Sequence, residues 1–297
     1  MSGYTLGVIG GSGLYALDGL TDVTELEVET PYGAPSDRLV RGTLGQTTLL
    51  FLPRHGRGHR IPPTAINYRA NVCAMKKAGA THLLSVSAVG SMREEIAPGD
   101  LVVPDQYIDL TKRRVSTFFD EGVVGHVGFA DPTCSDLASA VAAAAEHVVT
   151  HFGDSAKRGR VHRGGTYVCM EGPQFSTRAE SLLYRTWGVS VIGMTALPEA
   201  KLAREAELPY ATLALATDYD CWHESEESVT VEGVLAVMHA NVEKSRATIA
   251  RLAGALPDPA KSRAHGALAS AIMTAPEAMS AEAKARLGWL LKARLSR

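Results

Sequence analysis

Two acidic residues follow a buried-type apolar run and could carry acid–base chemistry. The run Leu213–Ala216 leads into Asp218 and Asp220, two carboxylates separated by one residue. The carboxyl ends of buried strands form the usual ligand-binding edge of an α/β sheet. An acid beside an apolar wall can have its pKa raised enough to donate a proton. The pair is therefore suited to accept from an exocyclic amine and to protonate a ring nitrogen. The plain alternative is a turn capped by Asp218 beside a solvated Asp220.

A glycine-rich loop near the N-terminus could bind an anion. The apolar run Leu6–Ile9 passes directly into Gly-Gly-Ser-Gly at residues 10–13, where Ser12 adds a hydroxyl donor to a bare backbone. Residues 11–16 also fit the G-x-G-x-x-G/A fingerprint of NAD-binding folds. That fold needs a full crossover helix next, and Asp18-Gly19 interrupts any helix early. A loop that holds one phosphate is favoured, with NAD binding and a ligand-free turn as alternatives.

A second candidate anion site follows the apolar run Thr47–Leu52. Arg54 can offer a fork of donors to phosphate from the end of a strand, and His55 can add another donor. His55 and His59 are four residues apart, a spacing that places two metal ligands on one face of a helix. The intervening glycines disfavour a helix and no third ligand stands nearby, so we expect no metal here. A solvated basic loop is the other interpretation.

The elements that must position these residues alternate along the chain. Short runs rich in Val, Leu and Ile, without strict alternation, are typical of strands buried on both faces. They predict strands at Thr5–Ile9, Thr47–Leu52, Thr81–Val86, Leu101–Val103, Tyr167–Met170, Val189–Ile192 and Tyr210–Ala216. Helices are predicted at Thr64–Ala78, Ser135–His151, Thr177–Trp187, Leu197–Ala206 and Val231–Ala253. The alternation favours an α/β fold with a largely parallel sheet covered by helices on both faces.

Local signals mark helix ends and the domain organisation. Thr177 and Glu180 have the spacing of a capping box. A proline-containing break follows residue 254, and Ser280 could cap a last amphipathic helix. We therefore predict a single domain over residues 1–254 and a helical C-terminal extension over residues 255–297. The sequence leaves open whether this extension packs on the body or on a neighbouring subunit.

The composition excludes several classes of protein. The 297 residues include 30 Lys and Arg against 32 Asp and Glu, and this near-neutral balance without basic runs predicts no nucleic-acid or membrane-surface partner. No stretch approaches the roughly 20 apolar residues of a membrane span, and we expect no signal peptide. The 4 cysteines are scattered without a metal-ligand spacing, so we expect them to be reduced. The expectation is a cytoplasmic protein.

Six motifs occur in the order that they have in the trimeric purine nucleoside phosphorylases. They are the glycine loop, the Arg-His-Gly loop, Ser87-Ala88-Val89-Gly90-Ser91, Glu171-Gly172-Pro173-Gln174-Phe175-Ser176, Gly193-Met194-Thr195 and Thr217-Asp218-Tyr219-Asp220. Over roughly residues 5–252 the chain resembles this family, and within it the branch that acts on S-methyl-5′-thioadenosine. The resemblance implies one α/β domain with a mixed central β-sheet flanked by helices, assembled as a homotrimer. It implies no metal and no cofactor, because inorganic phosphate is the co-substrate.

The resemblance also implies a role for each matched residue. The phosphate would be held by Ser12, Arg54, His55, Ser87, Ala88 and Thr195. Asp218 and Asp220 would be the catalytic pair that meets N7 and the 6-amino group, with Met194 against the ribose, Phe175 over the base and Ser176 next to it. Ser176, Asp218 and Asp220 together favour a 6-amino over a 6-oxo purine.

Two further assignments concern the 5′ end of the nucleoside. Val231, Val234 and Leu235 would receive the 5′-methylthio group, although a stripe at helical spacing is equally compatible with plain core. His126 would reach into the neighbouring subunit's site, although by sequence alone it is a surface-loop histidine.

The implied activity is that of a pentosyltransferase, the phosphorolysis of S-methyl-5′-thioadenosine to adenine and 5-methylthioribose 1-phosphate in purine and methionine salvage. A broader purine nucleoside phosphorylase acting on adenosine, 5′-deoxyadenosine or inosine is the alternative within the family, since some promiscuity toward the 5′ group is expected. An NAD-binding oxidoreductase and a catalytically silent nucleoside-binding protein are the alternatives from other classes.

Overall fold

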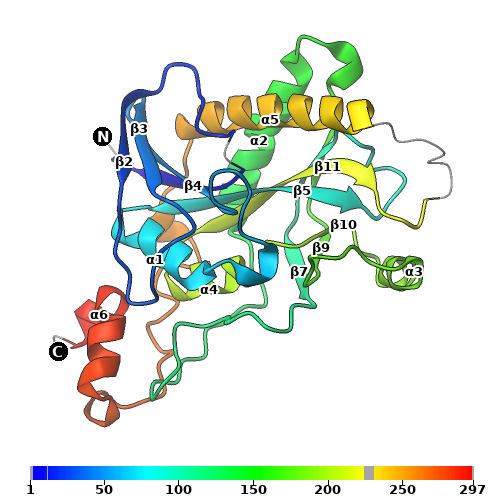
Figure 1. The fold of residues 1–297 in the computed structure, drawn as a ribbon. Coiled ribbons are helices and arrows are strands. Elements are labelled where there is room, and N and C mark those ends of the chain that lie inside the picture. The colour runs from blue at the N-terminus through cyan, green and yellow to red at the C-terminus, as the bar shows by residue number, and fades with distance from the viewer. Residues whose placement is uncertain (1–2, 12, 224–230, 296–297) are drawn as a thin grey trace.

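The fold is a mixed β-sheet with helices on both faces (Figure 1). A computed structural model describes residues 3–11, 13–223 and 231–295, without the side chains of residues 231–236 and 292–295. One face of the sheet is covered by α2 (Ser135–His151) and α5 (Val231–Ala253), and the other by α1 (Tyr68–Lys77) and α4 (Glu199–Glu205). α3 (Arg178–Thr186) lies beside one end of the sheet. The predicted α/β class is confirmed.

The sheet runs in the order β2-β3-β4-β1-β5-β10-β9-β7, and β5 also pairs with β11, which continues through β6 to β8. The strands are β1 (Thr5–Gly10), β2 (Thr21–Leu26), β3 (Leu39–Leu44), β4 (Thr47–Pro53), β5 (His82–Ser91), β6 (Leu101–Val103), β7 (Gln106–Asp109), β8 (Val161–Arg163), β9 (Thr166–Cys169), β10 (Val191–Gly193) and β11 (Tyr210–Tyr219). Parallel pairings join β1 to β4 and β5, and β5 to β11. Because β2, β3 and β4 form antiparallel pairs and β10 runs antiparallel to β5, the sheet is mixed, as the resemblance implied, and less parallel than the apolar runs suggested.

Every predicted strand and helix is present, with shifted ends at some of them. α1 begins at Tyr68 instead of Thr64, because Asn67 caps it by accepting from the backbone N–H of Ala70 at 3.1 Å. The predicted capping box of Thr177 and Glu180 is formed. β5 continues well past its predicted end at residue 86, and this continuation carries the Ser-Ala-Val-Gly motif.

The glycine loop after β1 does not lead into a crossover helix. The chain turns and enters β2, an exposed strand antiparallel to β3. A dinucleotide-binding unit requires a helix at this point. The G-x-G-x-x-A match at residues 11–16 is therefore not an NAD fingerprint, and the oxidoreductase interpretation of this loop is wrong.

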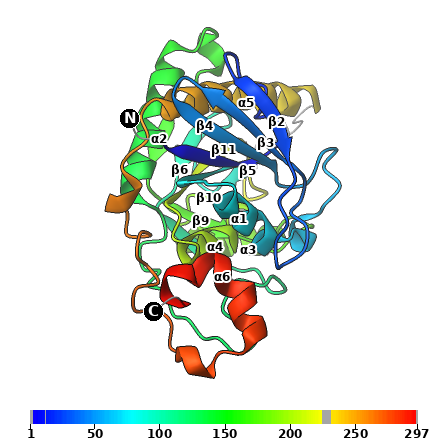
Figure 2. The same ribbon diagram turned by 90° about the vertical axis from the view of Figure 1, so that its left-hand side faces the viewer.

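The C-terminal segment packs against the body of its own chain (Figure 2). Leu287 and Leu291 of α6 (Ala281–Leu295) belong to the same buried cluster as Phe118, and Ser280 caps the helix through the N–H of Ala283 at 3.1 Å. Upstream of α6, the carbonyl of Ala271 accepts from the backbone N–H of residue 126 at 2.8 Å. The extension thus also holds the loop that carries the predicted subunit-bridging histidine. No described helix has the length and apolar composition of a membrane span.

Candidate active site

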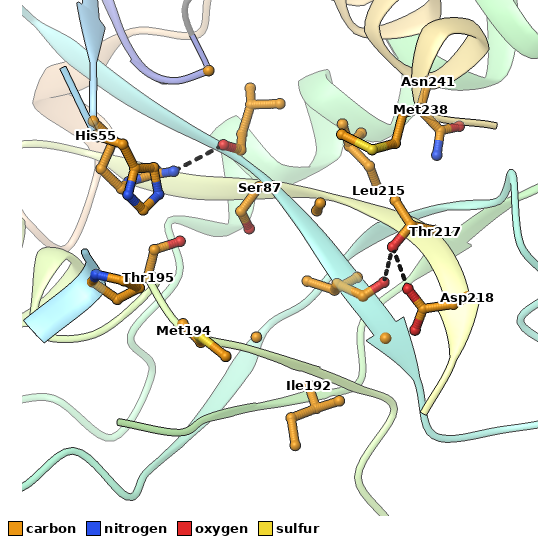
Figure 3. A pocket seen from close by; sticks show the side chains of 18 of the residues that line it. His55, Ser87, Ile192, Met194, Thr195, Leu215, Thr217, Asp218, Met238 and Asn241 are labelled. Carbon is orange, nitrogen blue, oxygen red and sulfur yellow. Dashed lines mark hydrogen bonds between the residues drawn. The ribbon is translucent and has the colours of Figure 1, made fainter. Parts of the chain in front are cut away.

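A cavity of about 450 Å³ lies where β1, β4, β5 and β11 reach their carboxyl ends (Figure 3). Among the predicted site residues, those that line it are Arg54, His55, Ser87, Ala88, Phe175, Met194, Thr195, Asp218 and Asp220. Ser176 and His126 are not part of the lining. Ser12 and the side chains of Val231, Val234 and Leu235 lie outside the described residues. The six motifs, far apart in the chain, thus meet around one cavity of the size that small-molecule sites have.

Arg54 is buried at one end of this cavity and is paired with a second buried charge. Its Nε lies 3.0 Å from Oε2 of Glu199, a residue at the start of α4. Nη1 donates to the carbonyl of Val86 at 3.0 Å. Nη1 carries two hydrogens, and the described residues accept one of them, which leaves one for a ligand in the cavity. Burial alone would lower the pKa of Arg54, but the Glu199 carboxylate outweighs burial and raises it. The guanidinium is therefore a fixed positive charge.

His55 is the second nitrogen-bearing side chain at this end. Its Nδ1 lies 2.8 Å from the carbonyl of Ile61, and its ring stacks on that of His59 at 4.2 Å. Burial lowers the pKa of His55 to about 4, so the ring is neutral at pH 7 with its proton on Nδ1. The Nε2 atom is then an acceptor suited to a protonated phosphate oxygen. The described residues contain no group of three or more side chains that could hold a metal ion.

The opposite end of the cavity holds the two carboxylates. The pairing of β11 with β5 shifts between Ala216 and Asp218, and such a bulge redirects a side chain next to a site. The hydroxyl of Thr217 donates to Asp218 at 2.7 Å and also lies 3.3 Å from the carbonyl oxygen of Val89. Gly90 leaves room for this arrangement, since a Cβ there would lie 3.2 Å from Oδ1 of Asp218. Figure 3 shows His55 and Thr195 on one side of the cavity and Thr217 and Asp218 on the other.

The second carboxylate is held by α3. Oδ2 of Asp220 accepts from the hydroxyl of Ser181, which is fully buried. Phe175, in the loop before α3, lines the cavity and is 83% exposed as a residue. The cavity thus has donors for an anion at one end, two carboxylates at the other and an exposed aromatic ring at its edge. Such a site can bind an anion and a flat, amine-bearing ligand at the same time.

The long helix α5 forms part of the cavity wall. Met238, Asn241 and Val242 line it, and Met238 and Val242 continue the apolar stripe predicted from Val231 onward. Among the described side chains of α5, Met238 and Val242 line the cavity, while Ile249 further along is fully buried in the core.

Sequence reasoning missed the residue that holds two of the motif loops together. The side chain of Arg114 donates to the carbonyl of Met194 at 2.6 Å and to that of Leu197 at 2.7 Å. It also donates to the carbonyl of Glu171 at 2.6 Å and pairs with the carboxylate of Glu171 at 3.1 Å. The neighbouring Arg113 offers the same residue type, so no sequence signal distinguishes the two. Glu199 was missed because it stands 145 residues from Arg54, and no local sequence pattern pairs residues so far apart.

Comparisons with known proteins agree with this geometry. The sequence profile of the phosphorylase superfamily matches residues 5–254. The S-methyl-5′-thioadenosine phosphorylase of Geobacter sulfurreducens is 54% identical over 287 residues, which cover 96% of this chain and 97% of that protein. A crystal structure of a methylthioadenosine phosphorylase from an Antarctic soil metagenomic library has a TM-score of 0.91 at 48% identity and covers 98% of this chain and 100% of its own.

A second solved structure carries a ligand. A mutant of the adenosine/methylthioadenosine phosphorylase from Schistosoma mansoni, in complex with methylthioadenosine, has a TM-score of 0.78 at 34% identity and covers 99% of each chain. The profile, the relatives and the solved structures agree over almost the whole chain, and they confirm the resemblance that the ordered motifs indicated. The chain belongs to the phosphorylase superfamily.

Proposed function

We propose that this protein is a pentosyltransferase that cleaves S-methyl-5′-thioadenosine with phosphate, giving adenine and 5-methylthioribose 1-phosphate in purine and methionine salvage. The observation that carries the proposal is the cavity that places Arg54 and its neighbours at one end and Asp218 with Asp220 at the other. Relatives about half identical over nearly the full chain bear the name S-methyl-5′-thioadenosine phosphorylase.

The buried end of the cavity is the phosphate site of this proposal. Phosphate oxygens are acceptors, and this end offers the remaining N–H of Arg54 with the hydroxyls of Ser87 and Thr195, beside Ala88 of β5. His55 completes the site through Nε2. Ser12 of the glycine loop adds a hydroxyl on the strength of the resemblance alone.

The carboxylate end is the purine site. Asp218 donates a proton or a hydrogen bond to N7, and Asp220 accepts from the 6-amino group. Phe175 covers the base and Ser176 lies next to it, with its hydroxyl directed at the sulfur of Met170 at 3.2 Å. Met194 lies between the two ends in Figure 3, where the ribose would be.

The reaction follows from holding these two groups in one cavity. A phosphate oxygen attacks the anomeric carbon while the bond from that carbon to N9 breaks, and the bonding electrons leave with the purine. Protonation at N7 by Asp218 neutralises the departing base. The fixed charge of Arg54 keeps the phosphate next to the developing ribosyl cation, so orientation and electrostatics supply the catalysis. Neither a covalent enzyme intermediate nor a cofactor is part of this scheme.

We further propose that the protein is a cytoplasmic homotrimer with its 5′ site at the subunit boundary. His126 is exposed, on a loop anchored by the carbonyl of Ala271, and in this proposal it reaches a neighbouring subunit's site. In this proposal residues 1–254 form the phosphorylase domain and residues 255–297 an extension that supports this loop. Val231, Val234 and Leu235 would contact the 5′-methylthio group. The 4 free cysteines agree with a reducing compartment. Light scattering at a mass other than three chains would contradict the trimer.

Product analysis tests the proposed reaction. The full chain is incubated with S-methyl-5′-thioadenosine, with and without phosphate, and the products are separated and weighed by mass spectrometry. We expect adenine and 5-methylthioribose 1-phosphate in equal amounts, and neither without phosphate. Adenine with free methylthioribose in the absence of phosphate would make the protein a hydrolase instead. No release of base under either condition would leave a nucleoside-binding protein.

A further inference from the structure

Two buried hydroxyls at the phosphate end of the cavity have no hydrogen-bond partner among the residues that the structure describes. One is Oη of Tyr167 in β9, a residue with no exposed surface, and the other is Oγ of Ser87 in β5. Buried hydroxyls are nearly always hydrogen-bonded in folded proteins, so two neighbouring hydroxyls without another partner are suited to bond to each other.

The two hydroxyls are close neighbours. Burial raises the pKa of Tyr167 well above its usual value, while the hydroxyl of Ser87 and the backbone of Thr195 act at short range to lower it. Gly193 lies against the same phenol, because a Cβ at this glycine would stand only 1.9 Å from Oη of Tyr167. The glycine of the Gly-Met-Thr motif is thus required by the position of the Tyr167 hydroxyl.

Tyr167 stands behind the cavity wall. Ser87, Gly193 and Thr195 line the cavity and Tyr167 does not, so the phenol backs the hydroxyls that face an anion. A serine hydroxyl has one proton to donate and can accept two hydrogen bonds. Phosphate requires donors, so the proton of Ser87 must point into the cavity. If the phenol of Tyr167 donates to Oγ of Ser87 from the side away from the cavity, the serine proton cannot point to that side. It must then point into the cavity.

We propose that Tyr167 is a positioning residue for phosphate: its hydroxyl donates to Oγ of Ser87, which turns the serine proton toward a phosphate oxygen. Tyr167 itself touches neither substrate. The inference rests on the proposed phosphorolysis and adds to it a residue outside the six motifs.

The test is Tyr167→Phe, a change that removes one oxygen atom and no other contact. With S-methyl-5′-thioadenosine saturating, we expect the phosphate concentration for half-maximal rate to rise about three- to tenfold, as the loss of one hydrogen bond predicts. We expect kcat at saturating phosphate and KM for the nucleoside to change less than twofold.

A neighbouring tyrosine provides the matched control. Tyr107 in β7 is directly paired with Tyr167, but its hydroxyl is bonded to that of Thr212 at 2.8 Å and does not line the cavity. Tyr107→Phe should lower the melting temperature and leave the phosphate dependence within twofold of the parent. In the Ser87→Ala background, Tyr167→Phe should have no further effect on phosphate, because the acceptor is gone.

Measuring the melting temperature at several concentrations of inorganic phosphate tests the role of Tyr167 separately from the proposed phosphorolysis. If the parent releases base and Tyr167→Phe leaves its phosphate dependence unchanged, the inference is overturned and the function stands. The same holds if the effects of Tyr167→Phe and Ser87→Ala add. If the parent cleaves no nucleoside, a phosphate-induced stabilisation that is smaller in Tyr167→Phe than in the parent and Tyr107→Phe still supports the positioning role, and equal stabilisation in all three overturns it.

Discussion

The hydroxyl of Ser181 in α3 donates a hydrogen bond to the carboxylate of Asp220, which follows β11. The residues are 39 positions apart, and the contact fixes one oxygen of a carboxylate that lines the cavity. A site that recognises an exocyclic amine needs its acceptor held in one orientation by such a supporting contact. The bond between Ser181 and Asp220 therefore connects the packing of α3 with the choice of purine.

Removal of this hydroxyl should weaken the preference for 6-amino purines. For Ser181→Ala we expect kcat/KM on S-methyl-5′-thioadenosine to fall about three- to tenfold, the effect of one hydrogen bond, with a smaller change on inosine. Thr186→Ala is the control, because this hydroxyl on the same helix bonds only to the carbonyl of Leu183 among the described groups. An equal loss on both nucleosides would show that Ser181 supports the fold and not the specificity.

Asp218 should discriminate between the two purine classes more strongly. Asparagine keeps the shape of the side chain but cannot protonate N7, so Asp218→Asn should lower kcat on 6-amino nucleosides by about a hundredfold or more. Activity on 6-oxo nucleosides should fall far less. Initial rates on adenosine and inosine measure the difference, with Asp136→Asn on the exposed start of α2 as the control. Loss by the same factor on both substrates would remove Asp218 from base recognition.

The buried pair of Arg54 and Glu199 predicts an unusual dependence on phosphate. Glu199→Gln leaves the guanidinium without its counter-charge and should destabilise the protein by about 3–5 kcal/mol. Bound phosphate would replace the missing negative charge, so it should raise the melting temperature of this variant more than that of the parent. Glu146→Gln, which breaks the exposed pair with Arg163, is the control and should change stability by less than about 1 kcal/mol. If phosphate raises the melting temperature of the parent and of Glu199→Gln equally, phosphate does not bind next to Arg54.

Glu205 predicts a change of stability with pH. Burial raises the pKa of this carboxyl from 4.5 to about 7, although it accepts from Thr117 and from the backbone of Phe118. Between pH 4.5 and 7 the folded state holds a proton that the unfolded state has lost, so the free energy of unfolding decreases as pH rises through this window. Glu205→Gln should remove this contribution.

The contribution of Glu205 to the pH dependence of stability is measured by denaturant unfolding of the parent and of Glu205→Gln at several pH values. The difference in stability between the two proteins should change by no more than about 3 kcal/mol from pH 4.5 to 7, in favour of the variant at the higher pH. Taking the difference cancels other titrating groups, such as His55 and His82, whose pKa values are lowered to about 4 by burial. Parallel stability curves would contradict the assignment.

The strands that carry the site could be predicted because they are buried on both faces. β1, β4 and β11 appear in the sequence as apolar runs, and their buried residues explain why. β2 was missed because its residues are almost all exposed and mostly polar, so it lacks an apolar run. The short β8 was missed because three residues, Val-His-Arg, cannot be told from a loop by pattern.

The site could be predicted only as far as its motifs are local. Residues of the cavity wall belong to short motifs at strand ends, and the structure brings most of them together. The supporting contacts join distant segments, as Arg114 does with Met194 across 80 residues, and no local pattern encodes such a pairing. Tyr167 was predicted as a buried strand residue. The role proposed for its hydroxyl depends on Gly193 and Ser87, which are close to it only in the folded structure.

Competition between nucleosides in a single reaction tests the proposed function most directly. Equal concentrations of S-methyl-5′-thioadenosine, adenosine and inosine are incubated with the protein and excess phosphate, and each is followed by chromatography, so that the relative rates give the ratio of kcat/KM values. We predict that S-methyl-5′-thioadenosine disappears first, that adenine accumulates, and that no base is released without phosphate. Hypoxanthine appearing as fast as adenine, or base released without phosphate, would contradict the account.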